Sequence, residues 1–311
     1  GSPGARSLEI RDAGASFIGK FLMALFPYVR KVSIIAGVAV MTGVAHGQGN
    51  FAPEGAEFNV TGSLLGEQVY PSVSISPSGG YLVWQDNITD GDFAGISALK
   101  LDGSLAGTLS TFRVNEMAAG LQERPAVAVL NNGGAAFIWL GGSIGFQHVY
   151  GRFMSPGGWV TGDVLINTAT NQYQSEAALA TLTNGNVVVT WSSSSQVSPT
   201  SLRDIYFQIL TPTGQKFGGE TLVNQTTSFN QRTASVTSLS DGRFVVVWVS
   251  EQQRFENSVD LYGRIFSATG QAASSEFLIN SSTNVCANPS VAAALDGGFL
   301  VAWMERDLQN N

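Results

Sequence analysis

Short apolar runs that end on tryptophan recur along the chain, each following a turn that contains glycine. They are SGGYLVWQD (78–86), NGGAAFIWL (132–140), NGNVVVTWS (184–192), DGRFVVVWVS (241–250) and DGGFLVAWM (296–304). A two-residue turn with glycine before a strand-like run is the strongest short-range signal of a β-hairpin. The runs are nearly continuously apolar rather than alternating, which is typical of strands covered on both faces.

The runs belong to a repeat with a period above 50 residues. Its tryptophans lie 55, 52, 57 and 55 residues apart, at Trp84, Trp139, Trp191, Trp248 and Trp303. A second marker is the asparagine that closes RVN or L(I/V)N, at Asn115, Asn167, Asn224 and Asn280. Each full unit reads as four short strands: one after the asparagine, the tryptophan run, a run such as DLYGRIF (260–266), and a fourth that leads to the next asparagine.

Four antiparallel strands at this period predict the blades of a β-propeller, because such a sheet is covered by a neighbour on each face. We expect an all-β chain of four full blades and a truncated fifth, with units at about 57–110, 111–163, 164–220, 221–276 and 277–311. The ring would be incomplete in these residues. The early run AEFNV (56–60) could complete the fifth blade, and further blades are an equal alternative.

The N-terminal residues carry a different pattern. Two basic residues, Arg30 and Lys31, precede an apolar stretch that ends in small residues, which predicts a secretory signal peptide at 23–47. Residues 1–22 would then be an upstream or disordered segment, and 48–311 the repeat domain. The alternative is a membrane anchor that stays attached, since 16–29 is also apolar.

Composition narrows the chemistry. The net charge is −7, which disfavours nucleic acid as a partner. With Cys286 as the single cysteine and His46 and His148 as the two histidines, thiolate metal clusters, His-based zinc sites and Ser–His–Asp catalysis are disfavoured.

Length varies mainly between the second and third strands of each unit, in loops 85–95, 140–147, 192–203 and 249–259. In a propeller these loops share one face, and variable loops on a rigid scaffold commonly bind ligands. The candidate ligand-binding residues are Asp86, Asn87, Asp90, Asp92, His148, Arg203, Glu251 and Arg254. Asp86, Asp90 and Asp92 surround a glycine, as Ca²⁺ ligands often do, although a solvated turn is the favoured interpretation and no other cofactor is expected.

Several recurring polar residues suit structural roles. Asp204 and Asp260 precede the same tyrosine and are expected to hydrogen-bond a neighbouring turn. Arg152 and Arg264 share a strand position and are expected to pair at the blade rim. The recurring asparagines are expected to close turns with their amides, and Cys286 to be buried and inert.

The pattern F.VN…Q..P.VA.L.DGGFVV.W……D.YGR.F…G resembles a repeat of roughly 55 residues from large secreted bacterial proteins. Those proteins often also carry RTX-type calcium-binding, cadherin-like or sorting domains. The resemblance covers 57–311, and NPSVAAALDGGFLVAW (288–303) matches it best. It implies a propeller, export, and in most members no assigned activity.

Two functions remain open at this point. The sequence favours a non-catalytic binding, adhesion or scaffold module, secreted, periplasmic or on a cell surface, that recognises glycan or protein through the variable loops. It would have no nucleic-acid partner and no stable membrane span in the mature chain, and further domains or blades of the same parent chain would accompany it. The alternative is a secreted hydrolase, glycosidase- or lyase-like, whose central channel collects acids from several blades.

Overall fold

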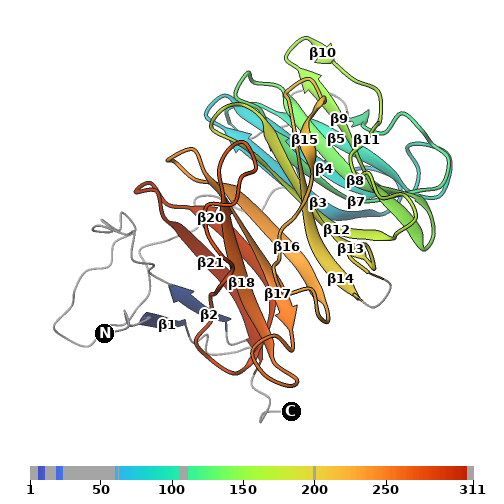
Figure 1. Ribbon diagram of the computed structural model, residues 1–311. Coiled ribbons are helices and arrows are strands. Elements are labelled where there is room, and N and C mark those ends of the chain that lie inside the picture. The colour runs from blue at the N-terminus through green and yellow to red at the C-terminus, as the bar shows by residue number, and fades with distance from the viewer. Residues whose placement is uncertain are drawn as a thin grey trace.

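The computed structural model describes residues 60–61, 63–104, 111–198 and 201–306, and the backbone of β1 (Arg6–Ile10) and β2 (Gly19–Met23). These two strands pair antiparallel, and β2 lies beside β21 (Phe299–Arg306) (Figure 1). Apart from Met23, the predicted signal at 23–47 lies outside the described residues, as does the strand predicted at 56–60 apart from Val60. Across the described ranges, no helix has the length and apolarity needed to cross a membrane.

Five antiparallel sheets follow one another along the described chain. Sheet 1 contains β3 (Gln68–Ser76), β4 (Gly79–Asp86), β5 (Gly95–Leu101) and β6 (Phe112–Arg113). Sheet 2 contains β7 (Leu121–Val129), β8 (Ala135–Ser143) and β9 (Phe146–Ser155), with β10 (Gly158–Trp159) and β11 (Val164–Leu165) both paired to β9. Sheet 3 contains β12 (Gln174–Thr181), β13 (Val187–Ser194), β14 (Arg203–Leu210) and β15 (Lys216–Leu222). Sheet 4 contains β16 (Gln231–Ser238), β17 (Phe244–Glu251), β18 (Val259–Phe266) and β19 (Phe277–Leu278). Sheet 5 contains β20 (Val285–Ala293) and β21.

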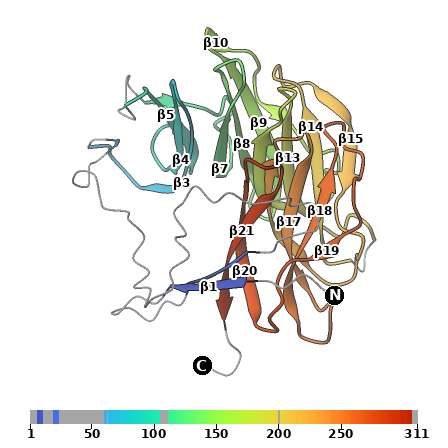
Figure 2. The same cartoon turned by 90° about the vertical axis from the view of Figure 1, so that its left-hand side faces the viewer.

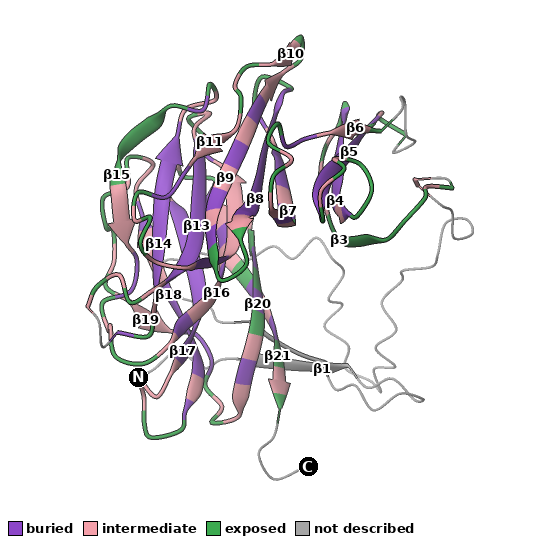
Figure 3. Cartoon of the chain, turned by 90° about the vertical axis from the view of Figure 1, so that its right-hand side faces the viewer, coloured by how far each residue is buried: buried purple, intermediate pink, exposed green. Residues whose placement is uncertain are grey.

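The sheets stack face to face, and their first strands lie side by side (Figures 2 and 3). The prediction of an all-β chain of antiparallel sheets is confirmed, with four strands in sheets 1, 3 and 4. The described residues do not form a closed ring. The short fourth strands β6, β11 and β19 pair with the third strand before them, so each sheet ends a few residues beyond the predicted unit boundary.

β17 shows why the tryptophan runs lose alternation. Phe244, Val246 and Trp248 lie in one apolar cluster with residues of sheet 3. Val245, Val247 and Val249 lie in another cluster with residues of sheet 5. All six side chains are fully buried, and each buried aliphatic or aromatic side chain stabilises the fold by roughly 1.5–3 kcal/mol relative to exposure. Both faces of the strand therefore need a neighbouring sheet.

The recurring asparagines close the sheets at their outer ends, as expected. Each Oδ1 accepts the N–H of a third-strand residue at 2.7–2.8 Å, and each Nδ2 donates to the carbonyl two residues further on; the four are Asn115, Asn167, Asn224 and Asn280. The same Nδ2 of Asn224 and Asn280 donates to Asp204 and Asp260, which confirms the structural role expected for those aspartates.

Side chains of one sheet also bind the backbone of the sheet before it. Glu220 accepts the N–H of Thr168, and Glu276 accepts that of Gln225, both at 2.7 Å. Arg152 and Arg264 donate to carbonyls of the preceding sheet, at Val114 and Val223, and Arg152 also lies 4.0 Å from Glu116. These contacts fix the spacing between neighbouring sheets near their outer edges.

Because these strands are buried on both faces, removal of one indole should greatly lower the free energy of unfolding. Trp248→Ala should destabilise the protein by about 3–5 kcal/mol, because the cavity lies between two sheets that cannot collapse onto it. Urea unfolding followed by circular dichroism measures the change. Trp159→Ala is the matched control and should cost clearly less, since Trp159 is only half buried; equal losses would contradict the role given to sheet stacking.

Candidate functional site

The acidic loop after β4 is closed by its own side chains. Asp86 accepts hydrogen bonds from the N–H groups of Ile88 and Thr89 and from the Thr89 hydroxyl, at 2.7–3.0 Å. Asn87 accepts the N–H of Glu67. Asp86 is 4% exposed, so the favoured interpretation as a solvated turn does not hold for this residue.

The other two acids of this loop point to different partners. Asp90 accepts from Asn115 Nδ2 at 3.0 Å, and Asp92 accepts from the N–H of Gly120 at 3.0 Å. Among the residues that the structure describes, no three His, Cys, Asp or Glu side chains come together as a metal site. The loop therefore offers no gathered set of calcium ligands.

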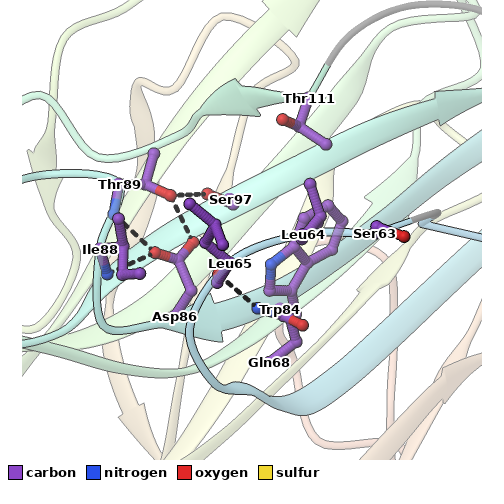
Figure 4. Close-up of a pocket in the computed structure, with 10 residues that line it drawn as sticks. All are labelled: Ser63, Leu64, Leu65, Gln68, Trp84, Asp86, Ile88, Thr89, Ser97 and Thr111. Atoms are coloured by element: carbon purple, nitrogen blue, oxygen red, sulfur yellow. Dashed lines mark hydrogen bonds between the residues drawn. The ribbon is translucent and has the colours of Figure 1, made fainter.

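A cavity of about 310 Å³ lies beside this loop, over Trp84 (Figure 4). Trp84 occupies the position where Trp139, Trp191 and Trp248 are each covered by the preceding sheet. In sheet 1 the cover comes instead from Val60 and Leu64. At the edge of this cavity, the Thr89 hydroxyl donates a hydrogen bond to Asp86. These polar groups therefore stabilise the loop itself and are not free to bind a ligand.

The remaining candidates from the sequence also lie in structural contacts. Nδ1 of His148 lies 3.3 Å from Asn167 Nδ2, and burial lowers the pKa of the imidazole. Arg203 forms a backbone bridge to Asn230 at the junction of sheets 3 and 4. Glu251 lies at the same junction, where it accepts from Asn230 and pairs with Arg232 at 2.7 Å.

Arg254 neutralises a buried acid. Its guanidinium lies 2.8 Å from Asp260, which is 1% exposed, and also donates to the carbonyl of Ser282. Asp204 takes the equivalent place in sheet 3, and there burial raises the pKa of the carboxyl despite hydrogen bonds from Asn224 and Ser201. Cys286 is fully buried, and burial raises the pKa of its thiol to about 12, which agrees with an inert role.

The structure brings together residues that the sequence did not single out. They lie on the first strand of each sheet, which we call the inner strand. Each first strand contains a β-bulge two or three residues after its start. At each bulge one non-glycine residue has φ between 50° and 56°; these are Tyr70, Arg124, Glu176, Thr233 and Asn288. We call these five residues the axial rim. Left-handed backbone at non-glycine residues is strained and concentrates at functional sites.

Two pairs of rim residues from adjacent sheets contact each other. The guanidinium carbon of Arg124 lies 4.6 Å from the ring centre of Tyr70. Oε2 of Glu176 accepts the N–H of Thr233 at 2.7 Å and the hydroxyl of Ser192 at 3.0 Å. The rim therefore presents a carboxylate, a cation and an aromatic ring on the inner strands of sheets 1 to 4. The rim and the variable loops lie at the same end of the strands.

Further along the same strands lies a cavity of about 340 Å³ lined by sheets 1 to 4. Its lining residues are Val73, Ser74, Val127, Ala128, Val129, Leu179, Ala180, Thr181, Val236, Thr237 and Ser238. These are aliphatic and hydroxyl side chains, so the carboxylates expected in a central channel lie at the rim and not along this part of the wall. Glu123, next to Arg124, is a second acid at this level and accepts from Gln147 at 2.5 Å.

Sequence reasoning missed the rim because a bulge adds one residue without changing the apolar pattern that surrounds it. The nearest sequence signal is the residue just before the first-strand proline of PSVSI, PAVAV and PSVAA, which is Tyr70, Arg124 or Asn288. Its residue type differs in every unit, so no repeat marks it.

No family model and no curated protein matches the sequence. Among solved structures, the chain is similar to an α-L-arabinofuranosidase from Lactobacillus brevis (12% identity, 78% of this chain and 85% of that one, TM-score 0.46). It is similar to an α-L-arabinofuranosidase from Fusarium graminearum (10% identity, 78% and 93% covered, TM-score 0.48). A third is an endo-arabinase from Bacteroides thetaiotaomicron (13% identity, 81% and 95% covered, TM-score 0.44).

These comparisons contradict two predictions from the sequence. The chain was expected to be a non-catalytic binding, adhesion or scaffold module, and an enzyme was disfavoured. The similar structures are glycoside hydrolases and not non-catalytic modules.

The Asp86 contacts predict a pH-dependent contribution to stability. Burial raises the pKa of this carboxyl, but hydrogen bonds from Ser97, Thr89 and the backbone outweigh it and hold the pKa below 3.8. The stabilisation is therefore present above that pH and is lost as the pH falls through the lower folded-state pKa. Asp86→Ala should cost roughly 1–3 kcal/mol at pH 7.

Urea unfolding of both proteins at pH 7, 5 and 3 checks this, since the difference between them should shrink only at the lowest pH. Asp296→Ala removes an exposed acid from a hairpin turn and should show a small difference. A constant deficit for Asp86→Ala across the three pH values would contradict the assignment.

Proposed function

We propose that the chain hydrolyses glycosidic bonds at the axial rim, with Glu176 and Glu123 as the acting carboxyl groups. The observation that carries the proposal is the placement of Glu176 on a strained bulge, at φ 56°, on an inner strand. Glycosidic hydrolysis needs two carboxyl groups, one to protonate the leaving oxygen and one to attack or to activate water.

The contacts of Glu176 suit the second of these roles. Donors from two sheets, the Thr233 N–H and the Ser192 hydroxyl, converge on Oε2 and hold the carboxylate in one position. Oε1 has a single long contact of 3.4 Å to the Thr233 hydroxyl. That oxygen is the one placed to act on a substrate.

Glu123 suits the role of proton donor. It lies on the neighbouring inner strand, at the position before the bulge residue, and is half buried. Gln147 holds one of its oxygens at 2.5 Å, which leaves the other for a proton that can pass to a leaving group.

The setting of the site supports a sugar ligand. Half-exposed aromatic rings with nearby polar groups bind one face of a sugar ring through their apolar surface, and Tyr70 is 48% exposed at the rim. We further propose that the five sheets are blades of one propeller of the repeat type that the sequence resembles, and that the protein acts outside the cytoplasm, supported by the signal-like segment at 23–47.

Release of reducing sugar from a panel of arabinan, arabinoxylan, xylan, galactan and polyuronates tests the activity. Glu176→Gln and Glu123→Gln should each lower kcat by about 10²–10⁴-fold with little change in stability, because each retains its shape and loses its charge or proton. Thermal unfolding of each variant shows that the fold is kept.

Glu256→Gln is the control, since Glu256 is an exposed acid of the loop after β17, and it should keep full activity. The proposal fails if the wild-type protein releases sugar from no glycan of the panel, or if both rim variants remain as active as the control.

A further inference from the structure

The guanidinium of Arg124 differs from the other cations near the rim. Arg232, one residue before the bulge of sheet 4, is paired with Glu251 at 2.7 Å. Arg254 is paired with Asp260 at 2.8 Å. Within the part of the chain that the structure describes, no carboxylate forms an ion pair with Arg124, which is exposed.

The loop of sheet 2 also lacks the acid that the loop of sheet 4 provides. Glu251 stands three residues after Trp248, and the residue three after Trp139 is Gly142. Gly142 has φ 122°, a conformation that side chains rarely adopt. Sheet 2 therefore has no side chain at the position from which Glu251 pairs with Arg232, whose own counterpart in sheet 2 is Glu123.

Arg124 is nevertheless held in place. Its backbone N–H donates to Oε1 of Gln85 at 3.1 Å, and its guanidinium stacks on Tyr70 with 4.6 Å between the guanidinium carbon and the ring centre. Stacking occupies one face of the planar group and leaves its N–H edges free, which are the donors that bind a carboxylate in a bidentate manner. An oriented cation without an acid partner is a site for an anionic group.

We propose that Arg124 binds the carboxylate of a sugar substrate, which makes the rim selective for glycans that contain uronic acid. This inference rests on the proposed function, since it names the substrate class of the same rim. Tyr70 is a positioning residue in this arrangement, because it orients the guanidinium. Glu176 lies on the next inner strand and is the reacting group.

The test uses binding, so that it is independent of turnover. Isothermal titration of the Glu176→Gln variant with a galacturonate trimer and with its methyl ester compares one sugar with and without the charge, and a mannuronate trimer with its ester repeats the comparison. At least one acid should bind about tenfold or more tightly than its ester. Arg124→Gln, added to this variant, should remove the preference, and Arg124→Lys should restore it only in part.

Arg243→Gln is the matched control, since Arg243 lies in the hairpin turn before β17 and pairs with Asp241; it should leave the preference intact. Added salt should weaken binding of the acid more than binding of the ester. The inference is overturned if neither acid is preferred, or if Arg124→Gln keeps the preference.

Failure of this inference and failure of the proposed function can be told apart. If Arg124→Gln alone hydrolyses neutral glycans of the panel at the wild-type rate and neither acid is preferred, the hydrolase stands and the uronate selectivity does not. If the acids are bound through Arg124 but the wild-type protein cleaves no glycan, the rim binds uronates and the catalytic roles of Glu176 and Glu123 are wrong. Thermal unfolding of Arg124→Gln should match the parent, because a purely structural stack would instead lower stability.

Discussion

Two-sided burial of the second strands is the constraint on which this molecule depends. A strand such as β17 is apolar toward sheet 3 and toward sheet 5, so sheet 4 depends on both neighbours. Polar groups between the sheets must then be satisfied by protein atoms, since water is excluded and an unpaired buried group costs about 1–3 kcal/mol. The asparagine amides and the caps from Glu220 and Glu276 meet that demand at the outer end of each sheet.

The same constraint explains why charged side chains of the variable loops form hydrogen bonds and ion pairs within the protein. Asp86 and Arg254 were candidate ligand groups because they are charged and lie at loops of uneven length, and Arg254 pairs with the buried Asp260. Each lies close enough to the stack to be buried or half buried, and each therefore bonds a neighbour rather than solvent. A charged residue indicates binding only where no neighbour pairs with it, and Arg124, on the bulge of β7, meets that condition.

The inner strands are packed differently from the second strands. They lie side by side, each against the first strand of the next sheet, and a bulge can place a strained residue there without opening the apolar stack. Five bulges at one level put Tyr70, Arg124, Glu176, Thr233 and Asn288 into one rim. The stack supplies the rigidity that holds the left-handed backbone, and the rim supplies residue types that vary from sheet to sheet. This division between a uniform scaffold and a varied rim is what allows one repeat to carry a specific site.

The periodicity of the sequence determined the sheets, their antiparallel strands, the buried indoles and the asparagine that closes each unit, because these follow from local spacing and from residues that recur in register. It also showed Asp204 and Asp260 as structural. Only the tertiary structure decided the functional residues. The bulges depend on how each inner strand fits against its neighbours, and whether a charge is paired depends on what lies beside it: Arg232 pairs with Glu251, whereas Arg124 stacks on Tyr70. Contacts between residues some 50 positions apart, such as Glu176 with Thr233, are set by packing of whole sheets, and no local pattern records them.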